Sequence, residues 1–154
     1  MKISILQIGK TKDKWLNEGI EEYLKRLSAF VQVDVIELAD ASIKTLGNPE
    51  SVRDKEAMSV LKRLDDDDYV VLLDELGAQK TSVEFAEFLV SLSTKKHVVF
   101  VIGGVFGASK ALKERADCTV ALSRMTFTHR MARLILCEQI YRAMMINANR
   151  SYHV

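Results

Sequence analysis

A glycine-rich segment is the first feature of this sequence that could support chemistry. The stretch Ile102-Gly103-Gly104-Val105-Phe106-Gly107 follows an apolar run and precedes a helix expected to begin near Ala108 or Ser109. Backbone without side chains can approach a ligand closely, so the segment is a candidate binding loop. The alternative is a structural turn, because strand-to-helix junctions in α/β proteins often need glycine.

The two most familiar nucleotide-binding motifs are absent from the chain. The glycine spacing is G-G-x-x-G rather than G-x-G-x-x-G, and the next expected strand leads to Ser123, where a dinucleotide-binding fold would place an acidic ribose ligand. No G-x-x-x-x-G-K-[ST] phosphate loop occurs. These spacings exclude the usual modes of dinucleotide and triphosphate binding.

Three loops are expected to meet in one pocket. In an open α/β sheet, ligands bind at the carboxyl ends of the strands. Leu73, Gly103 and Leu122 each lie at or just after the end of an expected strand. The loop after Leu73 carries Asp74 and Gly77, and the loop after Leu122 leads into the last helix. We therefore predict a site built from these three turns.

Short apolar runs and helical periodicity alternate along the chain. Five runs bounded by polar or turn residues predict strands over residues 2–8, 31–38, 69–73, 97–102 and 118–122. Helical spacing predicts helices over residues 16–27, 52–64 and 83–92, the last opened by a Thr81 and Glu84 capping box. The alternation predicts one α/β domain over residues 1–154 with a mainly parallel sheet.

Three other features have structural interpretations. Residues 65–68 are four consecutive aspartates, which we interpret as a solvated turn rather than a metal cluster. Cys118 and Cys137 have no neighbouring His or Cys at ligand spacing, so both are expected in the core and no metal site is predicted. Residues 39–50, which include the only proline, Pro49, are expected to form a long surface loop.

The expected final helix, residues 131–146, is unusually apolar. Of its 16 residues, 12 are apolar. A helix that is apolar nearly all round must be covered nearly all round, and a domain of this size seldom supplies that cover alone. We therefore predict a homodimer that buries this helix.

Charge is distributed unevenly along the chain. Residues 100–154 carry eight Lys or Arg against three acidic residues, whereas the preceding 99 residues carry 14 basic and 18 acidic ones. A polyanionic partner would meet the C-terminal third first, although solvated helix faces explain the pattern equally well. With neither an export signal nor an apolar run near the roughly 20 residues of a membrane span, we expect a cytoplasmic protein without a membrane partner.

Four motifs occur together in this chain. They are Ile102-Gly103-Gly104, Leu-Ser-Arg-Met-Thr-Phe-Thr-His-Arg-Met-Ala-Arg at 122–133, Glu138-Gln139-Ile140-Tyr141-Arg142-Ala143 and the terminal Tyr152-His153. Together they resemble the RlmH family of SPOUT-class methyltransferases. The early Gly9, Lys10 and Trp15 also agree with this family, and the match extends over the whole chain. Two departures stand out: the chain ends at Val154 where the family continues with Lys or Arg, and Val105-Phe106 follows Gly104 where the family has Pro or Ser.

The resemblance implies an α/β fold with a deep trefoil knot in roughly residues 70–154, a rare exception to the rule against threaded chains. It also implies an obligate dimer with the active site at the interface. The implied methyl donor, S-adenosylmethionine, would be held by backbone groups around Leu73, Gly103, Gly104, Leu122, Ser123, Arg124, Met125, Thr126 and Phe127. The implied reaction is methylation of N3 of a pseudouridine in the intersubunit stem-loop of large-subunit ribosomal RNA, on assembled ribosomes.

That reaction needs alignment of nucleophile, methyl group and sulfur, and no metal. The acceptor imide must lose a proton, so a base or a cation should lie near the methyl group. The candidate residues are His129, Tyr152 and His153, with Arg142 as charge stabiliser, and we expect the tail from Arg150 to fold over the base. His129 could equally serve as a structural cap or hydrogen-bond donor.

Two basic clusters could contact RNA, and the alternative is that they only keep the protein soluble. The first comprises Arg124, Arg130 and Arg133, which could bind RNA phosphates, and the second comprises Lys10, Lys12 and Lys14. Two other functions remain open on the residues alone: a SPOUT methyltransferase acting on another RNA such as transfer RNA, and a non-catalytic ribosome-binding factor.

Overall fold

The sheet has five strands, and every pair of neighbouring strands is parallel. A computed structural model describes residues 1–154. The strand order is β2-β1-β4-β3-β5. The strands are β1 (Lys2–Ile8), β2 (Gln32–Leu38), β3 (Tyr69–Gln79), β4 (His97–Ile102) and β5 (Cys118–Ala121). The predicted α/β class with a parallel sheet is confirmed.

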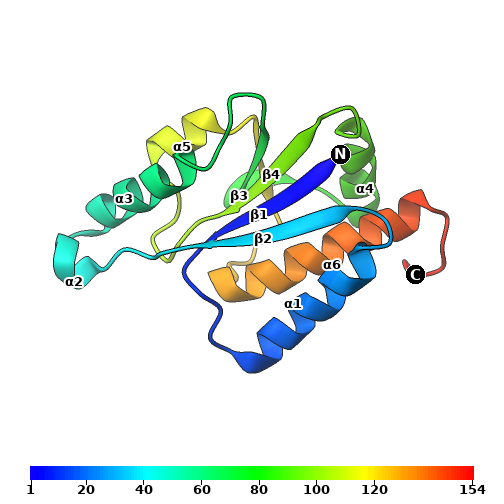
Figure 1. The fold of residues 1–154 in the computed structure, drawn as a ribbon, viewed down its shortest axis with the longest axis horizontal. Coiled ribbons are helices and arrows are strands. Elements are labelled where there is room, and N and C mark those ends of the chain that lie inside the picture. The colour runs from blue at the N-terminus through cyan, green and yellow to red at the C-terminus, as the bar shows by residue number, and fades with distance from the viewer.

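Helices cover both faces of the sheet (Figure 1). One face packs against α1 (Lys14–Leu27), α4 (Ser82–Ser91) and α6 (His129–Asn147), and the other against α3 (Pro49–Leu61) and α5 (Lys110–Arg115). Helix α6 lies against both α1 and α4. None of the helices combines the length and the apolar character that a bilayer crossing requires.

Burial on both faces explains the continuous apolar run of β4. Val98, Phe100 and Ile102 pack into the core beneath α1, α4 and α6, and Val99 and Val101 pack into the core beneath α3 and α5. All five side chains are buried. A central parallel strand needs apolar residues at every position because successive side chains point to opposite faces.

Strand β3 continues beyond its predicted end and crosses β5. The sequence indicated a strand ending at Leu73, but β3 runs to Gln79, and Val120 of β5 pairs with both Leu73 and Ala78. A strand residue has one neighbour on each side, so residues 74–77 carry the chain from one side of β5 to the other. Gly77 lies in this crossing, and a Cβ on it would be 2.8 Å from backbone atoms of Thr119 and Val120.

The long surface loop predicted over residues 39–50 is interrupted by helical structure. It contains a short helix, α2 (Ile43–Leu46), which ends at Gly47 in the left-handed conformation. Pro49 occupies the first turn of α3, where its missing N–H costs no hydrogen bond, and Asn48 caps that helix. The predicted capping box of Thr81 and Glu84 is present at α4.

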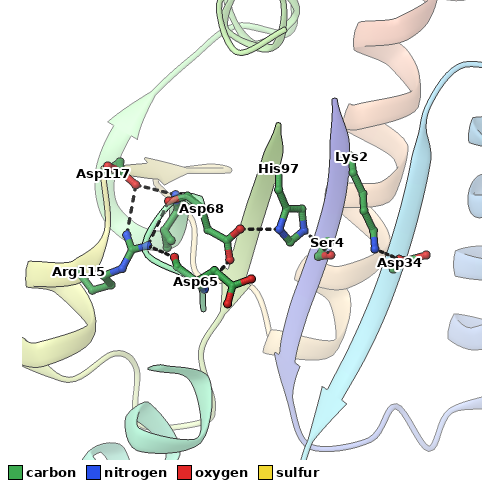
Figure 2. Close-up of polar contacts among 9 residues, drawn as sticks. Lys2, Ser4, Asp34, Asp65, Asp68, His97, Arg115 and Asp117 are labelled. Carbon is green, nitrogen blue, oxygen red and sulfur yellow. Dashed lines mark hydrogen bonds and ion pairs between the residues drawn. The ribbon is translucent and has the colours of Figure 1, made fainter. Parts of the chain in front are cut away.

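The four aspartates form a turn in which Asp65, Asp66 and Asp67 are exposed, as predicted, but Asp68 is buried. His97 Nδ1 donates to Asp68 Oδ1 at 2.6 Å, and Ser4 Oγ lies 2.8 Å from His97 Nε2 (Figure 2). Arg115 donates to the carbonyl oxygens of Asp65 and Asp68. Burial of Asp68 is tolerated because its carboxylate is hydrogen-bonded.

Ser4, His97 and Asp68 have the order of groups found in a serine hydrolase triad. Ser4 is only 2% exposed, and all three residues lie at the amino edge of the sheet. None of them lines the large pocket at the opposite edge. The contacts therefore join the beginnings of β1 and β4 to the turn before β3, and their role is structural.

Candidate active site

The three predicted loops meet in one cavity at the carboxyl edge of the sheet. Its volume is about 1050 Å³, and its walls include residues 73–76 after the first part of β3, 102–108 after β4, and 122, 123 and 125–132 after β5. The convergence predicted from Leu73, Gly103 and Leu122 is confirmed. Of its 26 lining residues, 13 are hydrophobic, which suits a ligand with an apolar body and a few polar groups.

The glycine loop needs its small residues for different reasons. Gly107 adopts a positive φ of 79°, which other residues rarely accept. Gly104 has an ordinary φ, but it lies directly against the Glu56 carboxylate, and a Cβ on it would overlap Glu56 Oε2. Glu56 is itself buried, and burial raises the pKa of its carboxyl group. Helix α3 thus supports the glycine loop from behind.

Gly104→Ala is expected to displace the glycine loop and to weaken binding of S-adenosylmethionine, the ligand that the family resemblance implies for this cavity, at least about tenfold, because a misplaced wall loses well-aligned hydrogen bonds. Isothermal titration calorimetry measures the effect. The double variant Glu56→Ala with Gly104→Ala removes the overlap, so most of the lost affinity should return. A Gly104→Ala protein that binds S-adenosylmethionine as tightly as the wild type would contradict the view that the glycine loop forms a wall of the binding site.

Most charged groups in the lining are already paired. Arg130 Nη1 donates to Asp13 Oδ2 at 2.8 Å, and Lys113 Nζ lies 3.6 Å from Asp74 Oδ2. Glu75 accepts a hydrogen bond from the Thr126 hydroxyl, which joins the loop after β3 to the loop after β5. These contacts stabilise the relative positions of the pocket walls.

His129 lies in the pocket wall at the first turn of α6. Burial, followed by the charges of Arg133 and Arg130, lowers the pKa of its imidazole. It is not the cap of the helix, because Met131 N donates to the Thr128 side chain. A neutral imidazole in the wall can accept or donate a hydrogen bond without adding charge.

Eight of the nine predicted cofactor residues line this cavity. They are Leu73, Gly103, Gly104, Leu122, Ser123, Met125, Thr126 and Phe127. Arg124 is not in the lining, and its Nε donates to Gln79 Oε1 at 3.1 Å. The arginine thus joins the loop after β5 to the end of β3.

The other three predicted catalytic residues form a separate cluster at the far end of α6. Arg142 donates two hydrogen bonds to Glu138 Oε1, and its Nη1 lies 3.2 Å from His153 Nδ1. Tyr152 donates to the same Glu138 oxygen at 3.1 Å and lies 3.3 Å from the Tyr23 hydroxyl. Burial, with these two neighbours, raises the pKa of Tyr152.

Within one chain this tail cluster is remote from the pocket. His129 lines the pocket and Arg142 belongs to the tail cluster, and the two lie 13 positions apart on one helix. At 1.5 Å per residue, that separation is roughly 20 Å. The tail cluster of a chain therefore does not contact the pocket of that chain.

The prediction that Arg133 binds RNA phosphates is wrong, because this residue is only 1% exposed. It donates to Thr11 Oγ1 and to the Ile8 carbonyl, and so ties the loop after β1 to α6. Burial lowers the pKa of its guanidinium group, and its Nε has no partner. Asp13, at the end of that loop, and Trp15, in the first turn of α1, both line the pocket.

Five further pocket residues were not predicted from the sequence: Asp13, Trp15, Leu16, Arg53 and Lys113. The first three follow β1, so the rule that ligands bind beyond carboxyl ends would have found them if applied to that strand. Arg53 and Lys113 come from α3 and α5, on the opposite face from α6, and no sequence pattern marks them. The structure contains no group of three or more His, Cys, Asp or Glu placed to hold a metal ion.

Comparison with known proteins agrees with this geometry. A family model described as "Predicted SPOUT methyltransferase" matches residues 1–153. The chain belongs to the SPOUT methyltransferase family. SPOUT proteins have a knotted α/β fold, and the passage of β3 across β5 is the kind of threading that such a knot requires.

Named relatives within the SPOUT family are similar along almost their whole length. A protein of Exiguobacterium sp. (strain ATCC BAA-1283 / AT1b) is 45% identical, and proteins of Bacillus thuringiensis (strain Al Hakam) and Bacillus cereus (strain B4264) are 46% identical. Each alignment covers 99% of this chain and 99% of the relative. All three relatives are named "Ribosomal RNA large subunit methyltransferase H".

Proposed function

We propose that this protein transfers a methyl group from S-adenosylmethionine to N3 of a pseudouridine in the intersubunit stem-loop of large-subunit (23S) ribosomal RNA. The observation that carries the proposal is the single cavity formed by the loops after β3, β4 and β5 in a chain of the SPOUT family. The name shared by the relatives supports ribosomal RNA as the substrate. The reaction takes place in the cytoplasm, on assembled ribosomes.

The pocket suits S-adenosylmethionine in size, composition and wall structure. When bound, this group supplies an electrophilic methyl on a sulfonium cation, and transfer needs alignment rather than acid catalysis. It would be held largely by backbone groups of Leu73, the glycine loop and residues 122–127. Backbone N–H and C=O groups can hydrogen-bond the edge of the adenine ring and the ribose hydroxyls without adding charge. Arg124 contributes by positioning, through its hydrogen bond to Gln79.

We further propose that the working unit is a homodimer in which the tail of each protomer closes over the pocket of the other. Pocket and tail cluster are too far apart in one chain, and α6 is incompletely covered. Around the pocket, Trp15 is 60% exposed and Val105 and Met125 are each 75% exposed. A second copy covering these apolar side chains would remove them from water and complete the site.

The tail cluster fits the chemistry of imide methylation. Arginine has only donors, so Arg142 donates to His153 Nδ1, which leaves the ring proton on Nε2. That N–H can donate to a carbonyl oxygen of the base and stabilise the negative charge that develops as the N3–H bond breaks and its proton passes to solvent water. Tyr152, packed against Tyr141 and Arg142, offers an aromatic surface for stacking.

The exposed Lys10, Lys12 and Lys14 follow β1 close to the pocket wall and would contact RNA phosphates. Arg130 is already paired with Asp13, so its share in phosphate binding is smaller than the sequence suggested. Recognition of the assembled ribosome then depends on shape as well as on charge.

A methylation assay tests the proposed function. Purified protein and labelled S-adenosylmethionine are incubated with 70S ribosomes, free subunits, naked 23S RNA or transfer RNA, and the product nucleoside is identified by mass spectrometry. We expect N3-methylpseudouridine from the ribosomal substrates. If only transfer RNA is methylated, the substrate is transfer RNA and the proposed ribosomal substrate is wrong. If the protein does not bind S-adenosylmethionine in calorimetry, it is a non-catalytic ribosome-binding factor.

A further inference from the structure

Arg53 is the cation in the pocket lining that has no partner. Each of the other two cations, Lys113 and Arg130, lies against a carboxylate. Arg53 has neither an ion pair nor a side-chain hydrogen bond, although its side chain is partly buried. A partly desolvated guanidinium without an acceptor loses interactions that water or a carboxylate would supply.

The place of Arg53 in the fold points to a ligand at the glycine loop. Arg53 comes from α3 and lines the main cavity together with Gly103 and Gly104. It also lines the much smaller adjoining cavity, which lies between that loop and Glu56. Glu56 is no partner for it, because no ion pair joins them and Ala41 N is the only donor to that carboxylate.

The charges of the lining residues indicate that the ligand group paired with Arg53 is negatively charged. Once Asp13 pairs with Arg130 and Asp74 with Lys113, the remaining charges are Glu75, which is hydrogen-bonded to a neutral hydroxyl, and Arg53. S-adenosylmethionine carries one carboxylate together with an ammonium and a sulfonium group. Backbone groups have no net charge, so the loops that surround the ligand cannot neutralise that carboxylate, whereas Arg53 can do so with charge-assisted hydrogen bonds.

We propose that Arg53 binds the carboxylate of the methionine moiety of S-adenosylmethionine and thereby selects ligands that keep the amino-acid end. The inference rests on the proposed function. It makes Arg53 a specificity-determining residue that acts from the opposite face of the sheet to α6 and the tail. A neutral adenosine thioether would lose this contact while keeping every contact with the three loops.

Calorimetry with two unreactive ligands tests the proposal. S-adenosylhomocysteine carries the carboxylate and the ammonium group, and S-adenosyl-3-thiopropylamine is the same molecule without the carboxylate. We expect Arg53→Gln to weaken binding of S-adenosylhomocysteine by about tenfold or more, as loss of a charge-assisted hydrogen bond predicts, and to leave binding of the decarboxylated ligand unchanged. Lys55→Gln is the matched control, because Lys55 is exposed on the same helix and outside the lining.

The outcomes separate this proposal from the proposed function. Equal losses for both ligands, or no loss for either, overturn the role of Arg53 while leaving a protein that binds S-adenosylhomocysteine. Unchanged ligand binding with weaker binding of ribosomal RNA would also overturn it, by assigning Arg53 to a phosphate. A wild-type protein that binds neither ligand refutes the proposed function, and the role of Arg53 with it.

Discussion

Gly77→Ala is expected to lower the free energy of unfolding by about 3 kcal/mol, because it overpacks the crossing of β3 over β5. The added Cβ would lie 2.8 Å from backbone atoms of both Thr119 and Val120. Backbone atoms cannot rotate away as a side chain can, so one of the two segments must shift. Chemical denaturation followed by circular dichroism measures the change.

Gly19→Ala is the matched control for Gly77→Ala. A Cβ on Gly19 would meet only the Leu134 side chain, at 3.0 Å, which can move. The substitution also gains about 1 kcal/mol of helix propensity within α1. We expect little net change, and a Gly77→Ala protein as stable as Gly19→Ala would refute the view that the crossing excludes a side chain.

His153→Ala is expected to lower turnover about a hundredfold, the range for loss of a proton-handling or anion-stabilising side chain, while S-adenosylmethionine binding stays unchanged. The imidazole is exposed and lies beyond the last helix, so its removal should not affect folding. Single-turnover methylation and calorimetry measure the two quantities separately. Equal turnover in variant and wild type would discard the proposed role of His153.

Mixing two inactive proteins tests whether the tail acts in the partner's pocket. A His153→Ala protein has an intact pocket, and a Gly104→Val protein keeps an intact tail but a filled glycine loop. If tails are exchanged, mixed dimers contain one working site, and random mixing should restore about a quarter of the wild-type rate. If the methylation rate does not recover in a sample shown to contain mixed dimers, either each tail acts at the pocket of its own chain or the tail takes no part in the reaction.

Local patterns predicted the elements of this fold closely. The strands Lys2–Ile8 and His97–Ile102 begin and end where the apolar runs do, because each run records burial on both faces of the sheet. The glycine segment, Leu73 and Leu122 were assigned to one pocket because parallel strands bring their carboxyl ends to one edge. These conclusions needed only the periodicity of side chains and a rule of topology.

Other features depend on residues that are far apart in the chain. Arg133 looked like a surface cation until its hydrogen bond to the Ile8 carbonyl, 125 positions away, placed it in the core. Asp68 was expected to be solvated like the three aspartates before it, but it is buried and hydrogen-bonded to His97, 29 positions away.

By itself, the sequence determined a parallel α/β domain with a three-loop pocket and, through its motifs, the family. Only the tertiary structure decided that β3 crosses β5 beside Gly77, that Arg53 reaches the pocket from α3, and that the tail cluster lies away from the pocket of its own chain. The physical reason is that local patterns report whether a side chain is buried, whereas chain crossings and charge pairs depend on which distant segment covers it.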